Sequence, residues 1–165
     1  MNGNVWVVEN WTDETLHFED PDENTVSLRI SFAFFNCNNC KIKIVGKCQN
    51  VKLNSCKKTE IITDMIVSQV EVYKCEAIEV RGIKQLPMVL VENSKQTHIW
   101  LYNSTKACKV STSSTRSTFI HFAKDGVTDD QLEELSNWTK EIVPEVYTSQ
   151  LVGGKLITEG YLEEE

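Results

Sequence analysis

Long apolar segments are missing from this 165-residue chain, and their absence is the first constraint on its class. No run approaches the roughly eighteen consecutive apolar residues of a transmembrane helix, so a membrane-spanning helix is excluded. The first ten residues also lack the basic start and the apolar stretch of a secretory signal peptide. We therefore expect one soluble, cytoplasmic domain over residues 1–165, without a membrane partner.

Sequence motifs that carry catalysis are missing as well. The chain has no Gly-x-Ser-x-Gly, Walker A or dinucleotide-binding glycine pattern. Its three histidines, His17, His98 and His121, are scattered through strand-like segments, which favours packing or surface roles over ligation. We predict that the protein is not an enzyme and has no catalytic residue and no cofactor.

Arginine is scarce, and the charges are unevenly distributed along the chain. The three arginines are Arg29, Arg81 and Arg116. Residues 1–30 carry a net charge of −6, residues 31–120 carry +7 and residues 121–165 carry −8. A basic region between acidic flanks indicates an acidic partner, although a merely solvated surface would have the same composition. Nucleic acid is not the expected partner, because clustered arginines and interleaved exposed aromatics are missing.

The chain does contain a repeat of nineteen residues. Small or apolar side chains recur at this period in four series, which are Cys37, Cys56, Cys75, Ser94 and Ser113; Val51, Val70, Val89 and Cys108; Leu53, Val72, Val91 and Val110; and Ile42, Ile61, Val80 and Ile99. A fixed period in several columns is typical of a repeat architecture. Within each repeat the apolar residues alternate, as in Val51 and Leu53, and this is the two-residue period of a β-strand.

The repeat predicts an all-β fold in the form of a β-solenoid. Each repeat holds two short strands and two turns, and stacked repeats place equivalent side chains one strand spacing apart. A β-sandwich has a similar spacing of strands, but it does not need side chains that recur in columns. We therefore predict coils of about 19 residues over residues 5–122.

Six cysteines raise the question of disulfides or a metal site. In a cytoplasmic protein they are expected to be reduced. Cys37 and Cys40 have the Cys-x-x-Cys spacing of zinc ligands, and Cys48 and Cys56 follow, so a structural zinc has to be considered. The nineteen-residue register argues against zinc, because it places cysteines in stacked columns of small, packable side chains. We predict unbridged thiols and no metal.

After Phe122 the sequence pattern changes. Thr128 and Gln131 have the spacing of a helical capping box, and apolar residues follow at three-residue intervals. Pro144 forbids continuation of a helix. The sequence therefore predicts one short helix that begins after Thr128.

The segment that follows Pro144 has the sequence signal of a β-hairpin. Two strand-like pieces, Val146–Leu151 and Lys155–Thr158, flank Gly153 and Gly154. The open end of a solenoid exposes apolar side chains and unpaired backbone. We expect the region of about 128–160 to cover such an end, either in its own molecule or in a second copy.

Several segments match one known domain family in both order and spacing. The densest match is the stretch from Gly46 to Lys58, with the pattern Gly-Lys…Ser-Cys-Lys-Lys. Further matches are Asp64, Val70-Glu71-Val72, Val143-Pro144-Glu145-Val146-Tyr147 and Gly154-Lys155-Leu156-Ile157-Thr158. On these residues the chain, from about Trp6 to Thr158, resembles the C-terminal β-sheet domain of the cyclase-associated proteins, which bind actin monomers. Ser55 departs from the family pattern, which usually has Asn before the cysteine.

This resemblance implies a right-handed parallel β-helix that dimerises by exchanging its C-terminal hairpin. It also implies binding of monomeric actin, preferentially in the ADP-bound form, and promotion of nucleotide exchange on actin during filament turnover. The family's N-terminal helical domain, proline-rich linker and WH2 motif have no counterpart in these residues, so we expect a short form. Filament severing with cofilin resembles a task of that N-terminal domain, so the resemblance of this chain does not extend to it.

The resemblance also supplies candidate site residues. Lys57 and Lys58 match the family's lysine pair, Asp64 and Glu71 match family positions, and Arg81 lies on a nearby coil; together they form the candidate actin-binding face. The candidate dimerisation residues are Val146, Tyr147, Leu151, Gly153, Gly154, Leu156 and Ile157.

Two alternative functions stay open at this point. Tubulin-cofactor-C-type domains share the β-helix and act as GTPase-activating proteins, which need a catalytic arginine. No arginine-finger motif surrounds Arg29, Arg81 or Arg116. The other alternative is a dimeric scaffold without a role in actin binding.

Overall fold

The computed structural model describes residues 4–19 and 29–162, and most of their regular structure is β-strand. In chain order the strands are β1 (Asn4–Glu9), β2 (Thr15–Phe18), β3 (Ile30–Phe35), β4 (Lys41–Asn54), β5 (Lys57–Tyr73), β6 (Glu76–Gln85), β7 (Met88–Glu92), β8 (Lys95–Leu101), β9 (Lys109–Ser113), β10 (Arg116–Ala123), β11 (Trp138–Ile142), β12 (Val146–Val152) and β13 (Lys155–Tyr161). The part of the predicted β-helix between residues 20 and 28 lies outside the described residues. In the described ranges, no helix has the length and apolar character needed to cross a membrane.

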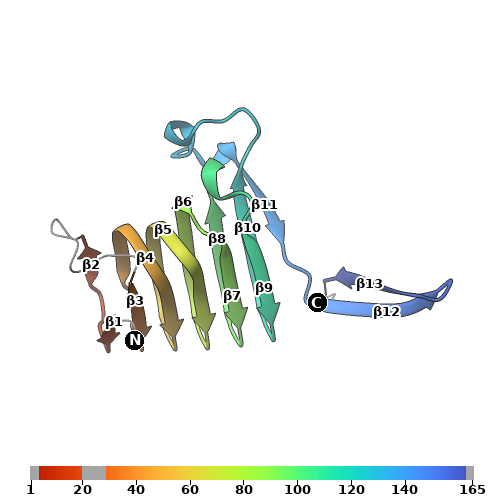
Figure 1. Cartoon of the computed structure of the whole chain (residues 1–165), viewed down its shortest axis with the longest axis horizontal. Helices are drawn as coiled ribbons and strands as arrows, with labels where there is room; N and C mark the ends of the chain where they lie inside the picture. The colour runs from red at the N-terminus through yellow and green to blue at the C-terminus, as the bar shows by residue number, and fades with distance from the viewer. Residues whose placement is uncertain (1–3, 20–28, 163–165) are drawn as a thin grey trace.

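The strands up to β10 form a parallel β-solenoid of about five turns (Figure 1). One of its sheets, called sheet A here, contains β1, β3, the C-terminal parts of β4 and β5, β7 and β9. The opposite sheet, called sheet B, contains β2, the N-terminal parts of β4 and β5, β6, β8 and β10. β4 and β5 are long because each runs through a corner from sheet B into sheet A. The predicted parallel β-solenoid is confirmed.

The predicted inward columns form the core of the solenoid. Val51 pairs with Val70 and Val70 with Val89, and all three side chains are fully buried. On the other sheet the buried column is Ile42, Ile61, Val80 and Ile99, again in direct register. Burying one such side chain contributes about 1.5–3 kcal/mol to the free energy of unfolding. The stacked aliphatic columns therefore form a core that continues from coil to coil.

The last coil corrects the predicted register. Val89 pairs with Val110 and Ile99 with Ile120, so the period there is 21 residues and no longer 19. Cys108, Val110 and Ser113 are consequently not in the columns predicted for them. The two additional residues fall in the connection that contains a 3₁₀ turn at Asn103–Thr105 between β8 and β9. This turn is fixed because the Thr105 hydroxyl donates a hydrogen bond of 2.7 Å to the Gly82 carbonyl of the preceding coil.

A four-residue turn, called the cysteine corner here, leads from sheet A to sheet B in every described coil. Its first and fourth residues have left-handed backbone conformations, with φ of 57° at Ser55 and 48° at Lys58, and equivalent residues have φ between 48° and 61°. The second residue of the turn points inward and is buried at Cys37, Cys56, Cys75 and Ser94.

The inward residues of the cysteine corner form a ladder along the solenoid. The Cys56 N–H donates to the Cys75 Sγ over 3.4 Å, and the Cys75 N–H donates to the Ser94 Oγ over 3.1 Å. Each side chain in turn donates to the carbonyl two residues earlier, as Ser94 does to Glu92 over 2.8 Å. A small side chain with a polar atom satisfies the buried backbone of such a corner, which explains the recurrence of Cys and Ser. The predicted stack is confirmed for these residues, and all six cysteines are free thiols.

The segment after β10 differs from the predicted short α-helix. It contains two 3₁₀ turns, Asp129–Gln131 and Leu135–Asn137, and Trp138 already belongs to β11, which pairs antiparallel with β10. The capping box of Thr128 and Gln131 is present, but Glu134 has an extended backbone that stops the helix. Leu132 and Trp138 pack with Trp100 and Ala123 in a second small core, and this packing outweighs the propensity of a segment too short for a stable α-helix.

The predicted hairpin is confirmed as β12 and β13. Gly153 and Gly154 form the turn with φ of 57° and 79°, a conformation that glycine adopts without steric cost. The hairpin extends away from the solenoid (Figure 1). Its side chains are almost all exposed, including Leu151 at 74% and Leu156 at 66%.

Candidate functional site

The outer side of the cysteine corner carries a row of exposed cations. Lys57, Lys95 and Arg116 occupy the same position in three coils, because the strands that begin there are in register. Lys58 and Lys74 flank this row at left-handed positions of the turn. All five residues are exposed, and we call them the basic corner.

One carboxylate lies among the cations of the basic corner in the strand register. Glu76 interrupts the row between Lys57 and Lys95 in the strand register. Among the described residues, however, no carboxylate lies within ion-pair distance of any of the five cations. Adjacent coils are only about 4.8 Å apart, so the like charges of the neighbours Lys95 and Arg116 reinforce one another, while Glu76 offsets part of the charge between Lys57 and Lys95. Five cations against one carboxylate leave the corner with a positive potential.

Arg81, a predicted site residue, lies on the outer face of sheet B and is held in place on both sides. Its guanidinium carbon lies 4.4 Å from the centroid of the Trp100 ring, and its Nε lies 3.8 Å from a carboxylate oxygen of Glu60. Burial raises the pKa of Glu60, and a hydrogen bond with Glu79 adds to this effect. Arg81 is therefore half-buried and less available to a partner than the lysine pair.

Asp64 and Glu71 each accept a hydrogen bond from a nearby group, and they lie in different parts of the solenoid. Asp64 lies in the corner opposite the cysteine corner, where its carboxylate accepts a hydrogen bond of 3.0 Å from the Gly46 N–H of the preceding coil. Gly46 has φ of 102°, so this contact stabilises a turn that only glycine forms readily. Glu71 lies on sheet A and accepts a hydrogen bond from the Gln69 side chain. The five predicted residues therefore do not form one continuous face; only Lys57 and Lys58 lie together.

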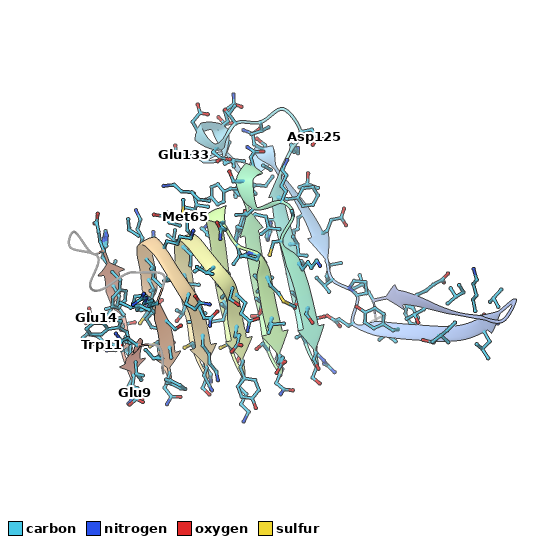
Figure 2. The ribbon with its side chains drawn as sticks, in the orientation of Figure 1. Glu9, Trp11, Glu14, Met65, Asp125 and Glu133 are labelled. Carbon is cyan, nitrogen blue, oxygen red and sulfur yellow. The ribbon has the colours of Figure 1, made fainter. Side chains whose placement is uncertain are left out.

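A groove of about 830 Å³ crosses sheet B beside the basic corner. Lys58, Glu60, Glu79, His98 and Phe119 contribute to its walls, and Asp13 and Glu14 lie at its first-coil end. Figure 2 shows Glu9, Trp11 and Glu14 at the end of the solenoid away from the hairpin. The groove thus has carboxylates at its first-coil end and a mixture of lysine, glutamate and aromatic side chains along its walls.

A stack of aromatic and cationic side chains covers the last coils of sheet B. His121 lies parallel to Trp100 with ring centroids 3.7 Å apart, and its Nε2 is 2.8 Å from the Nδ1 of His98. Burial lowers the pKa of His121 to about 4, and His98 and Lys140 add to the effect. Burial also lowers the pKa of His98. Both rings are therefore neutral at pH 7 and have a packing role.

Four of the six thiols have a raised pKa, which does not favour nucleophilic attack, whereas the hydrogen bond with Cys56 lowers the pKa of the buried Cys75. Burial raises the pKa of Cys37 and Cys108 to about 11 and that of Cys48 to about 12. The pKa of Cys56 is also raised, first by its hydrogen bond with Cys75 and then by burial. Over residues 4–19 and 29–162, no three His, Cys, Asp or Glu side chains gather in a way that would hold a metal ion.

The hairpin has two chemically different faces. Strand alternation and pairing place Tyr147, Leu151 and Leu156 on one face, with Ser149, Thr158 and Gly160 and without a charged residue. The opposite face contains Lys155 and Glu159 among Val146, Val152 and Ile157. The uncharged face is the one suited to burial against another surface.

Comparison with protein families identifies the family of this chain. Residues 1–162 match the family model described as adenylate cyclase associated (CAP) C terminal. The chain belongs to this family. The adenylyl cyclase-associated protein of Schizosaccharomyces pombe is 28% identical over 153 residues, which cover 88% of this chain and 27% of that protein. The corresponding protein of Dictyostelium discoideum is 27% identical over 161 residues, which cover 96% of this chain and 32% of that protein.

A solved structure agrees with the fold of this CAP C-terminal domain. The crystal structure of cyclase-associated protein from Cryptosporidium parvum superimposes with a TM-score of 0.79 at 17% identity, covering 95% of this chain and 90% of that one. The chain spans about a third of the length of the curated relatives it matches. The predicted family is confirmed, and the tubulin-cofactor-C-type alternative is not favoured.

Sequence reasoning missed three members of the basic corner. Lys74, Lys95 and Arg116 were not singled out, although Lys95 lies two periods of nineteen residues after Lys57. Following the column that starts at Lys57 would have found Lys95. Arg116 could not be found in this way, because the last coil contains two additional residues.

Proposed function

We propose that this CAP C-terminal domain binds monomeric actin through the basic corner and promotes nucleotide exchange on it. Membership of the family supports an actin-related role. The observation that carries the proposal is the basic corner, whose exposed cations form no ion pair with any described residue and which includes the lysine pair of the family-like stretch. Actin is acidic, so complementary charge would guide its docking and accelerate association.

The proposed exchange activity requires a difference in affinity between states of actin. A ligand shifts a conformational equilibrium only by as much as its affinities for the two states differ. Preference for ADP-actin in a conformation with an open nucleotide cleft would accelerate release of ADP. The domain would then return actin to the polymerisable pool and so regulate filament turnover, with a cytoplasmic, cytoskeletal location.

We further propose that the domain is a homodimer that exchanges its hairpin. A two-stranded hairpin is marginally stable in water by itself. Pro144 lies against Gly160 on the uncharged face, but Leu151 and Leu156 on the same face remain exposed in the described chain. The outer edge of β9 on sheet A is also unpaired in the described structure, so a partner's hairpin has a strand edge to join. A symmetric exchange would cover both solenoid ends and present two basic corners.

The binding proposal is tested by measuring the mass of complexes in solution. Multi-angle light scattering with the full chain, alone and with ADP-actin or ATP-actin, is expected to show a dimer that binds two actin monomers, more tightly with ADP. A dimer whose mass does not change with either form of actin would support the scaffold alternative and would contradict actin binding.

A further inference from the structure

The first coil of the solenoid, which we call the open end, has a strand edge without a partner. β1 is the first strand of sheet A, and among the described strands it pairs only with β3. The Asn10 N–H donates to the Phe35 carbonyl over 2.9 Å, so by strand alternation the even-numbered residues of β1 direct their N–H and C=O groups toward β3. The N–H and C=O groups of Val5, Val7 and Glu9 therefore point away from the solenoid. A free edge of this kind is a template for one more strand.

Large apolar side chains accompany this edge. The first coil leaves four of them between 43% and 54% exposed, which are Val5, Trp6, Val7 and Trp11. Val5 and Val7 lie on the outer face of sheet A. Trp6 instead points into the solenoid beside the buried Phe32, and no described strand covers its other side. Singly exposed apolar residues are common on protein surfaces, whereas several in one place mark an interaction site.

Trp11 occupies the inward position of the cysteine corner in the first coil. Asn10 and Asp13 have the left-handed conformations of that turn, with φ of 61° and 56°, so Trp11 lies in the column of Cys37. The turn is fixed to the next coil, because the Asn39 side chain donates to the Asp13 carboxylate over 2.7 Å. Between two coils this column holds only small side chains. At its end the larger indole presents apolar surface to whatever lies beyond.

The open end is acidic. Residues 4–19 contain neither lysine nor arginine but four carboxylates, on Glu9, Asp13, Glu14 and Glu19. Figure 2 shows Glu9 and Glu14 at this end of the molecule. No ion pair within the described ranges involves Glu9, Asp13 or Glu14. Their negative potential favours a cationic occupant, and it disfavours a second copy of the same end, because that contact would bring two sets of carboxylates together.

We propose that the open end binds an extended, basic and apolar segment of a partner protein, which adds one strand to sheet A beside β1. The backbone of the segment pairs with the free N–H and C=O groups of Val5 and Val7. Its apolar side chains cover Trp6 and Trp11, and a flanking lysine or arginine pairs with Glu9. In this mode of recognition the main-chain pairing supplies affinity and the side chains supply specificity. The proposed hairpin exchange covers the β9 end of each copy and leaves the open end free.

The test measures amide hydrogen exchange of the full chain by ¹H–¹⁵N NMR, with the peptide acetyl-Lys-Lys-Val-Ile-Val-Lys-Lys-amide as the probe. We expect the peptide to slow exchange of the Val5 and Val7 amides, because each gains an acceptor. The Val8 amide already pairs with β3, so its exchange should change little. The indole signals of Trp6 and Trp11 should move with the amides, and those of the other two tryptophans, which lie on β8 and β11, should not.

Comparison peptides separate charge from backbone pairing. A peptide with Glu in place of all four Lys should not bind, because the open end is acidic. Two further peptides carry an N-methyl group either on Ile or on both Val. An added strand pairs through alternate amides, so one of these two peptides should bind at least about ten-fold more weakly than the other.

Variants of the protein test the side-chain contacts. Glu9→Gln should weaken peptide binding about three-fold. Glu92→Gln is the matched control, because Glu92 is exposed in the same column of sheet A, four coils further on, and it should leave binding unchanged. Trp11→Ser inserts the residue that the corner has at Ser94 and should weaken binding about ten-fold, because apolar surface is lost.

Several outcomes would overturn the proposal. These are unchanged exchange of the Val5 and Val7 amides at millimolar peptide, an equal response to the acidic peptide, and equal binding of the two N-methylated peptides. Protection of these amides that rises with protein concentration in the absence of peptide would show that a second copy of the chain occupies the edge instead. None of these results depends on actin, so they leave the proposed actin function to its own test.

Discussion

At the scale of the residue, the cysteine corner explains why cysteine and serine recur. The buried second position of each turn needs a small side chain with a polar atom, because the backbone N–H of the preceding coil has to find an acceptor there. Cys75 and Ser94 meet this requirement with different chemistry, through a thiol and a hydroxyl. The Cys-x-x-Cys spacing of Cys37 and Cys40 made a zinc site worth considering, whereas the nineteen-residue register predicted a stack of small side chains, and the structure contains that stack.

The ladder predicts how Cys56 tolerates substitution. Cys56→Ser keeps a small polar atom, as at Ser94, and should change the free energy of unfolding by less than about 1 kcal/mol. Cys56→Leu adds volume to a fully buried position and removes the polar atom, so it should lower the free energy of unfolding by about 3 kcal/mol. Urea unfolding measures both values. Equal destabilisation by the two substitutions would show that the thiol itself is required.

The buried histidine pair predicts loss of stability in acid. The pKa of His121 is lowered from 6.5 to about 4 by burial, by His98 and by the nearby cations Lys140 and Arg81. A group whose folded-state pKa is lower than its unfolded-state pKa stabilises the protein above the unfolded value, and this contribution is lost as pH falls from about 6.5 to about 4. We expect His121 to account for about 3 kcal/mol of that loss.

The histidine prediction is measured by urea unfolding between pH 7 and pH 4. His121→Phe, which retains an aromatic ring beside Trp100, should flatten the pH dependence over this range. His17→Phe is the control, because His17 is exposed on β2 and should leave the wild-type dependence in place. A His121→Phe variant with the same pH dependence as the wild type would contradict the prediction.

At the scale of the element, periodicity predicted the coils well and predicted their exceptions poorly. The nineteen-residue period holds where nothing interrupts the stack, as in the column of Val51, Val70 and Val89. The 21-residue last coil was missed because a surface turn at Asn103–Thr105 has no apolar signature. The predicted helix became two 3₁₀ turns, since Leu132 and Trp138 gain more from packing on sheet B than from helical spacing. Such tertiary packing is not visible in a local pattern.

The hairpin predicts which substitutions separate the proposed dimer. Leu151 lies on the uncharged face of the hairpin and is 74% exposed in the single chain. Leu151→Asp should therefore produce a monomer, because a buried unpaired carboxylate costs several kcal/mol in an apolar interface. Gln150→Asp changes the neighbouring residue on the opposite, charged face and should remain dimeric.

Sedimentation velocity measures the state of assembly of both hairpin variants. Circular dichroism should show an unchanged solenoid in each, because the hairpin makes few contacts with it. A Leu151→Asp protein that sediments as a dimer, or a Gln150→Asp protein that sediments as a monomer, would exclude the uncharged face as the interface.

At the scale of the whole molecule, the fold determines where the charges lie on the surface. The sequence gives residues 31–120 a net charge of +7 but does not say where the cations lie. Winding the chain brings Lys57, Lys95 and Arg116 into one row, while Arg81 lies half-buried elsewhere on sheet B. Lys57 and Lys58 were therefore predictable as exposed neighbours, and the rest of the basic corner was not.

The most direct test of the basic corner is the rate of nucleotide exchange on ADP-actin. Exchange of a fluorescent ATP analogue is measured with the wild-type protein, with Lys57→Ala/Lys58→Ala and with Lys106→Ala/Lys124→Ala, which removes the same charge from the connections that follow β8 and β10. The wild-type and control proteins should accelerate exchange equally, and the corner variant should need about ten-fold more protein for the same rate, because two interface cations are lost. A folded, dimeric Lys57→Ala/Lys58→Ala protein that accelerates exchange as well as the wild type would contradict the assignment of actin binding to this corner.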